Sequence, residues 1–258
     1  MSRILSVALN TFREAVRDRV LYNLVFFALL MMVAAVFVGQ ISLGIESTII
    51  VSLGLSAISI IGLLIAVFIG VGLVSKEMEK RTLYALLAKP VRRWEFLVGK
   101  FGGLVLTLTV NTMAMAAGLF LALLFVKHSF EASDATILIA VYFILLKIAI
   151  VVSLALLFSC FTSPLLAILF TAGLYVAGLF IHEMRNLSGS KVSPAVQAFF
   201  SWISYILPNF ENFNVMAAAA HGKAVPGILI LQNTAYAAIY CAIVLAAASV
   251  VFSRRNLK

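Results

Sequence analysis

The stretch TIIVSLGLSAISIIGLLIAVFIGVGLV, residues 48–74, contains no charged side chain, and SKEMEKR, residues 75–81, follows it directly. A helix needs about 20 mostly apolar residues to cross roughly 30 Å of hydrocarbon. The apolar run is long enough to cross a bilayer, and the abrupt change to charge marks where the chain reaches water. This stretch therefore predicts a membrane-spanning α-helix that continues into a charged cytoplasmic segment.

Five other segments have the same apolar character, so the chain is predicted to be an all-α polytopic membrane protein with six transmembrane helices. The spans are expected at about 20–40, 48–74, 101–126, 137–161, 165–182 and 227–252. Only Phe161, Thr162, Ser163 and Pro164 separate the fourth and fifth spans, which predicts a tight hairpin broken at Pro164. No soluble domain is inserted, and residues 1–258 are expected to form one transmembrane domain.

The composition supports a lipid environment and excludes several classes of protein. Hydrophobic residues make up 64% of the 258 residues and charged residues only 11%, whereas a soluble domain carries roughly 25% charge. A secreted or cytosolic enzyme is therefore excluded. The net charge of +9 does not indicate a nucleic-acid partner, because the basic residues form short clusters between apolar runs. The partner of this surface is the lipid bilayer.

The distribution of lysine and arginine predicts the orientation, because cytoplasmic loops carry an excess of both. With the amino terminus inside, fourteen basic residues are cytoplasmic and four are outside. The inner ones are Arg3, Arg13, Arg17, Arg19, Lys76, Lys80, Arg81, Lys89, Arg92, Arg93, Lys100, Arg254, Arg255 and Lys258, and the outer ones are Lys127, Arg185, Lys191 and Lys223. Both termini are therefore expected in the cytoplasm, which agrees with an even number of spans.

Two segments outside the spans have interfacial character. Residues 2–19 predict an amphipathic helix in the cytoplasmic interface, with its arginines toward anionic head groups. Its apolar stripe is formed by Leu5, Ala8, Phe12, Ala15 and Val16, with Arg3, Arg13, Glu14, Arg17 and Asp18 mostly off it. In the outer segment 183–226, residues 195–207 predict a short helix that rests in the outer interface or re-enters the bilayer.

The cytoplasmic segment 75–100 is the most informative loop. The helix of the second span is expected to continue to about Ala88, and Pro90 then disfavours helix at the residue before it. The chain restarts near Arg92 and re-enters the bilayer at Lys100. The resulting short knuckle presents Leu83, Leu86, Leu87 and Trp94 among charges. The alternative is a solvated connector that merely obeys the positive-inside rule, although such a connector needs no leucine and aromatic residues.

This loop resembles the segment between the second and third spans in permease subunits of type-two ABC exporters. The pattern is carried by Glu77, Glu79, Thr82, Leu83, Leu86, Leu87, Pro90, Arg92, Gly99 and Lys100. Arg81 replaces the glycine that commonly precedes the threonine, which leaves the local loop geometry open. The amino-terminal helix with Phe12-Arg13-Glu14-Ala15 resembles the family's connecting helix, and Pro208 to Phe213 resembles an outer segment before the last span.

The resemblance implies a multi-pass permease of the bacterial inner membrane that exports a substrate by means of a separate ATP-binding subunit. Two permeases would pair, as a homodimer or a heterodimer. The ATPase would be contacted by Glu77, Glu79, Thr82, Leu83, Leu86, Leu87, Pro90, Arg92, Arg93 and Trp94, and movement would also pass to the interfacial helix with Leu5, Phe12, Arg13, Glu14 and Val16. Export direction and substrate class are not fixed by any residue pattern.

No residue pattern indicates chemistry within the chain itself. A phosphate-binding loop needs a glycine-rich turn followed by Lys and Ser or Thr, but Lys100 is followed by Phe101 and Lys223 by Ala224. The histidines His128, His182 and His221 share no ligand spacing, so neither a metal site nor another cofactor is expected. The chain is therefore expected not to be an enzyme.

Lys147 is the one charged residue near the middle of a predicted span. It could face a translocation path or the seam between two permeases, or its flexible stem could carry the ammonium outward to the interface. No span contains an acidic partner, and the nearest polar candidates are Asn111, Gln232 and Asn233. Lys147 leaves open a stand-alone secondary transporter, which usually carries several ionisable sites within the membrane.

Overall fold

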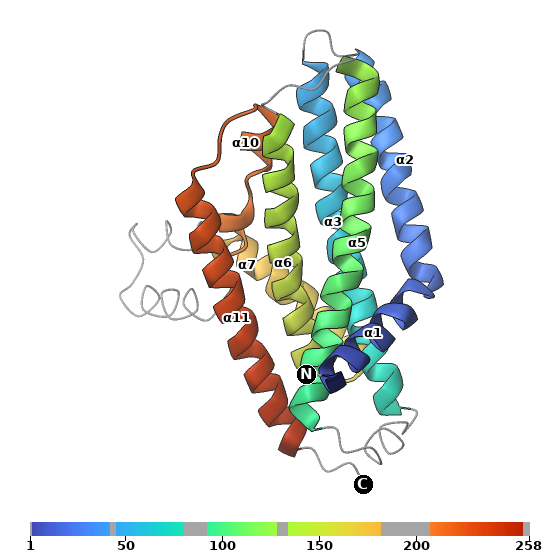
Figure 1. Ribbon diagram of the computed structural model, residues 1–258, viewed down its shortest axis with the longest axis vertical. Helices are drawn as coiled ribbons and strands as arrows, with labels where there is room; N and C mark the ends of the chain where they lie inside the picture. Colours follow the sequence, from blue (N-terminus) through green and yellow to red (C-terminus); the bar gives the residue numbers. More distant parts are fainter. Residues whose placement is uncertain (1, 42–44, 80–91, 128–133, 182–206, 255–258) are drawn as a thin grey trace.

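The computed structural model describes residues 2–41, 45–79, 92–127, 134–181 and 207–254, and these residues form helices and connecting turns without a strand (Figure 1). The elements in chain order are α1 (Ser2–Val16), α2 (Arg19–Ile41), α3 (Glu46–Glu79), α5 (Arg93–Lys127), α6 (Ala135–Ser159), α7 (Pro164–Leu179), the 3₁₀ turn η2 (Glu211–Phe213), α10 (Met216–Ala220) and α11 (Gly227–Arg254). The all-α prediction is confirmed for this part of the chain.

Several helices have the length and composition of membrane spans. Among the described residues, four segments are long and apolar enough to cross a bilayer, namely Glu46–Leu73, Arg93–Lys127, Ala135–Ser159 and Gly227–Ser253. Two shorter apolar helices accompany them, Leu24–Gln40 and Pro164–Leu179. These six segments coincide with the six runs expected from the sequence, and four of them reach the length of an independent span.

The helix ends follow from local chemistry. α3 continues through the charged residues to Glu79, as expected for a span that extends into the cytoplasm. α5 begins at Arg93, and the backbone N–H of Arg92 donates a hydrogen bond to the Glu95 carboxylate at 2.8 Å, which satisfies a donor that precedes the first turn. α7 begins at Pro164 after an extended Ser163, because proline fits the first position of a helix.

α6 is the central helix of the bundle, and it contacts α3, α5, α7 and α11. Its residues are apolar on all sides, which is the pattern of a helix that is surrounded by protein. Phe143, Ile144, Val151 and Leu156 are completely or almost completely buried. α2 lies at the periphery against α3 and α5, and α11 lies on the opposite side of the bundle in Figure 1.

One end of the bundle gathers the segments that the sequence places in the cytoplasm. α1 crosses this end beside α5, and the end of α3, the start of α5 and the end of α11 lie near it (Figure 1). α1 packs mainly against α5. The arrangement brings together three segments that are far apart in the sequence.

At the opposite end, residues 207–222 fold back onto the bundle. The side chains of Phe210 and Phe213 are buried, and the backbone N–H of Phe210 donates to the carbonyl of Gly178 on α7 at 3.3 Å. The Asn233 amide on α11 donates to the carbonyl of Asn212 at 3.1 Å. The segment is thus anchored to both helices, whereas the helix predicted over 195–207 lies, apart from its last residue, outside the described residues.

The close approach of this segment to α7 yields a prediction for Gly178. A Cβ at this position would lie 2.5 Å from the carbonyl oxygen of Pro208 and 2.6 Å from the Phe210 ring. Gly178→Ala should therefore destabilise the protein by about 1–3 kcal/mol, the usual cost of overpacking, and lower its melting temperature in detergent. Gly173→Ala on the same helix is the control, because a Cβ there meets nothing within 4 Å. Equal melting temperatures for the two variants would contradict this packing.

Candidate functional site

The candidate site is the beginning of α5, residues 92–103, which we call the foot of α5. It directly follows residues 80–91, which lie outside the described part of the chain. The foot combines two glycines in contact with α1, a buried lysine and an arginine in contact with α11. These features place it between α1 and α11, which are distant in sequence.

Two glycines one helical turn apart allow α1 to approach the foot closely. A Cβ on Gly99 would lie 2.7 Å from side-chain atoms of Val7, and one on Gly103 would lie 2.5 Å from the carbonyl oxygen of Ala8 and 2.6 Å from Thr11. Small residues of this kind let two helix backbones come together. Any larger side chain at Gly103 would displace the α1 backbone itself.

The Lys100 ammonium is held inside this contact. The lysine is 1% exposed, and its Nζ lies 3.5 Å from an Oε of Glu14, whose side chain is 40% exposed. Nζ also lies 5.8 Å from the centroid of the Phe96 ring. Because a buried charge is costly unless it is paired, the Glu14 carboxylate helps to keep α1 on the foot. The sequence placed Lys100 at the membrane boundary but did not indicate this pairing.

Arg93 connects the foot to the end of α11. Its Nη1 donates hydrogen bonds of 2.8 Å to the carbonyl oxygens of both Phe252 and Ser253. The guanidinium also lies 5.7 Å from the centroid of the Phe252 ring. The last carbonyls of a helix lack partners within the helix and carry partial negative charge, so Arg93 satisfies the end of α11.

A small apolar cluster lies beneath these polar contacts, separate from the main core. Its buried members are Phe96, Leu97, Cys160, Ala248 and Phe252. The rings of Phe96 and Phe252 are stacked with their centroids 6.1 Å apart, and Val7 of α1 packs against the cluster. The foot therefore contacts α1, the α6–α7 turn and α11 through one continuous set of side chains.

The predicted loop residues are divided by what the structure describes. Arg92 and Trp94 are exposed at the start of α5, whereas Arg93 is engaged with α11. Glu77 and Glu79 lie in the last turns of α3, and their side chains lie outside the part of the chain that the structure describes. The remaining predicted contacts also lie outside the described residues, and these are Thr82, Leu83, Leu86, Leu87 and Pro90.

The apolar stripe predicted on α1 is partly buried and partly exposed. Ala15 is fully buried, and Ala8 approaches Gly102 of the foot. Leu5, in contrast, is 60% exposed, and Leu9 is exposed beside it. The stripe is divided because α1 packs on protein as well as presenting a free surface. Arg13 lies on the exposed surface, while Phe12, Glu14 and Val16 are half-buried.

Lys147 lies inside the bundle between α3, α6 and α7. Its Nζ donates a hydrogen bond of 2.6 Å to the Ser59 hydroxyl of α3 and lies 5.9 Å from the centroid of the Tyr175 ring of α7. The partner is therefore neither Asn111 nor the polar pair on α11, and the ammonium does not extend outward to the interface. The sequence could not single out Ser59 because serines are frequent in the spans.

The model of the family described as ABC-2 family transporter protein matches residues 5–257. No curated protein matches the chain. The matched region includes most of α1, the foot of α5 and all of the helices with the character of spans.

The contact between α1 and the foot predicts different effects for neighbouring glycines. Gly103→Ala should loosen α1, because the new Cβ would collide with backbone, whereas Gly102→Ala should be tolerated, because its Cβ would lie 3.8 Å from Ala8. Limited trypsin digestion of the purified protein checks this, since Arg13 and Arg17 on α1 are exposed. Cleavage after these arginines should be several-fold faster in Gly103→Ala alone. Equal rates in both variants would exclude the proposed tight contact.

Arg93 should stabilise the last turn of α11. Arg93→Gln removes two charge-assisted hydrogen bonds and should cost on the order of 1 kcal/mol, given their partial exposure. Hydrogen exchange followed by mass spectrometry should then show faster exchange over residues 248–254. Arg92→Gln is the matched control, because Arg92 is the neighbour of Arg93 in the sequence and its side chain is exposed. Unchanged exchange in Arg93→Gln would show that these bonds do not hold α11.

Proposed function

Because the chain belongs to the ABC-2 family of transporter proteins, we propose that it is the permease subunit of an ABC exporter that uses ATP hydrolysed by a separate ATP-binding subunit. The observation that carries this proposal is the family match over residues 5–257, which takes in the cytoplasmic foot as well as the spans. In this proposal the chain forms one membrane domain and supplies the translocation path. The ATP-binding subunit supplies the energy of ATP hydrolysis.

We propose six crossings, with both termini in the cytoplasm of a bacterium and the chain in its inner membrane. α2 has 23 residues, which at about 1.5 Å per residue is roughly 34 Å and sufficient to cross. α7 has 16 residues and is therefore about 24 Å long, so we expect local thinning of the bilayer or support from its neighbours. The gathering of α1, the α5 foot and the end of α11 at one end of the bundle supports this orientation.

The ATP-binding subunit is proposed to contact the segment between α3 and α5. Arg92 and Trp94 are exposed at the end of this segment, and an exposed aromatic residue beside charges suits a protein contact. Movement of the segment would reach the foot directly, because Trp94 is itself part of the foot. From there the Glu14–Lys100 pair and the Arg93 bonds would carry it to α1 and α11.

A second permease is proposed to pair with this one, either as another copy or as a different chain. α7 supports the proposal because its outward surface is apolar and large. Leu165, Leu169 and Phe170 are exposed there in the single chain. A partner helix would cover this surface, and a pair of permeases would place two feet beside two ATP-binding subunits.

The proposal predicts which substitutions separate the two subunits. Leu86→Asp, Leu87→Asp and Trp94→Asp should each abolish or strongly reduce co-purification of an ATPase with the detergent-solubilised permease, because a buried carboxylate at an apolar contact is unfavourable. Thr162→Asp, in the short turn between α6 and α7, is the control and should leave co-purification unchanged.

Two results would contradict the proposed function. One is a complex that never contains an ATPase, and the other is undiminished binding in the three aspartate variants. Ion-gradient-driven flux through the purified chain without ATP would instead support a stand-alone secondary transporter. Lys147 is hydrogen-bonded inside the bundle to the hydroxyl of Ser59. This contact supplies no second ionisable group of the kind that a secondary transporter usually carries.

A further inference from the structure

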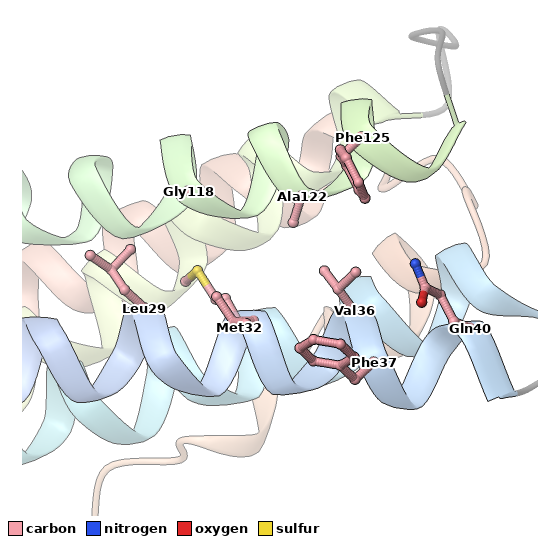
Figure 2. A pocket seen from close by; sticks show the side chains of 9 residues that line it. Leu29, Met32, Val36, Phe37, Gln40, Gly118, Ala122 and Phe125 are labelled. Carbon is pink, nitrogen blue, oxygen red and sulfur yellow. The ribbon is translucent and has the colours of Figure 1, made fainter.

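A crevice of about 500 Å³ lies between α2 and α5. Figure 2 shows Met32 and Val36 of α2 directed toward α5 and Phe125 of α5 directed back toward α2. The remaining lining residues are Leu29, Val33, Phe37, Gln40, Gly118 and Ala122. The crevice occupies the later half of α2, which is the end remote from α1 (Figure 1). Neither the foot of α5 nor Lys147 contributes to it.

The lining is apolar except at one end. Gln40 is its one polar side chain, and it precedes the last residue of α2. Phe37 and Phe125, beside this end, are exposed, so the crevice opens laterally to whatever surrounds the helices. An occupant must therefore be apolar along most of its length and can be polar at the end near Gln40.

The length of the crevice suits a hydrocarbon chain. The lining residues extend for about 16 Å along α2 and about 10 Å along α5, at 1.5 Å per residue. A hydrocarbon chain can lie along this length in contact with the apolar lining, with its polar end at Gln40.

The crevice cannot remain empty or fill with water at low cost. Water finds no hydrogen-bond partners on the apolar walls of such a crevice. An empty cavity also forfeits the dispersion contacts of its walls. Since α2 and α5 both have the composition of membrane helices, the opening is expected to face the hydrocarbon of a bilayer.

We propose that a hydrocarbon chain of a membrane lipid occupies this crevice, with its head-group end beside the Gln40 amide. The amide can donate a hydrogen bond to an ester carbonyl of the lipid and accept one from a hydroxyl. The about 16 Å of the crevice along α2 corresponds to roughly one leaflet of a 30 Å hydrocarbon core. The assignment of the site to the outer leaflet rests on the orientation proposed above. The existence of the site does not depend on that orientation.

The test compares two substitutions of the same size on α5. Ala122→Phe fills the crevice, whereas Ala117→Phe places the same ring on an exposed part of α5 that does not line it. Each full-length protein is extracted in mild detergent from cells, with any subunit that accompanies it, and retained phospholipid is counted by native mass spectrometry. Retention should fall several-fold in Ala122→Phe and match the wild type in Ala117→Phe. Ala122→Leu replaces Ala122→Phe if the larger ring prevents folding.

Two outcomes would overturn the proposal. The first is unchanged phospholipid retention when position 122 is enlarged. The second is efficient disulfide formation between two copies that carry Val33→Cys in a background without Cys160 and Cys241, which would show that another protein chain covers the crevice. ATPase co-purification in the same preparations tests the proposed function separately, because residue 122 is remote from the foot. Lipid loss with an intact complex would support the lipid site and leave the transport proposal in place.

Discussion

Hydrocarbon offers no hydrogen-bond partner, and this constraint determines where polar groups can lie in the bundle. The hydroxyls of Thr107, Thr171 and Thr234 each donate to the carbonyl four residues earlier in their own helix. Lys147 meets the same constraint by donating to Ser59. Among the described residues, only the amide nitrogen of Asn111 and the Thr112 hydroxyl are buried without a partner. Threonine hydroxyls within the spans are therefore satisfied locally, whereas Lys147 is satisfied by a neighbouring helix.

At the foot of α5, charged side chains are accommodated inside the protein. Lys100 can be buried there because Glu14 approaches it from α1 and because the glycines allow the approach. Arg93 can serve α11 because the final carbonyls of that helix have no partners of their own. Each contact depends on the other end of a long helix being anchored within the apolar core. The site is thus a consequence of helix length, since α5 continues from the foot through the core without interruption.

The sequence predicted what depends on local composition. Apolar length indicated the six apolar helices, an amphipathic pattern indicated α1, and Pro164 indicated the turn between α6 and α7. The contacts of the foot were beyond such reasoning, because Gly99 and Gly103 differ from other glycines only in the helix that lies over them. Ser59 was likewise indistinguishable from other serines until α3 and α6 were placed side by side. The division of the α1 surface required knowing that α5 covers part of it. The knuckle was predicted from its resemblance to a family. Its central residues 80–91 lie outside the described residues, so it stays a prediction.

The separation of the two apolar clusters bears on how movement could pass through the molecule. α6 belongs mainly to the large core and is enclosed by four helices, so it is the natural fixed element. The cluster of Phe96, Leu97, Cys160, Ala248 and Phe252 is small and lies at one end. Leu157 borders both clusters. A displacement of the foot would therefore shift α1 and the end of α11 together, while the large core resists it. Because α5 passes through both regions, a change in its tilt would connect a displacement of the foot to the spans.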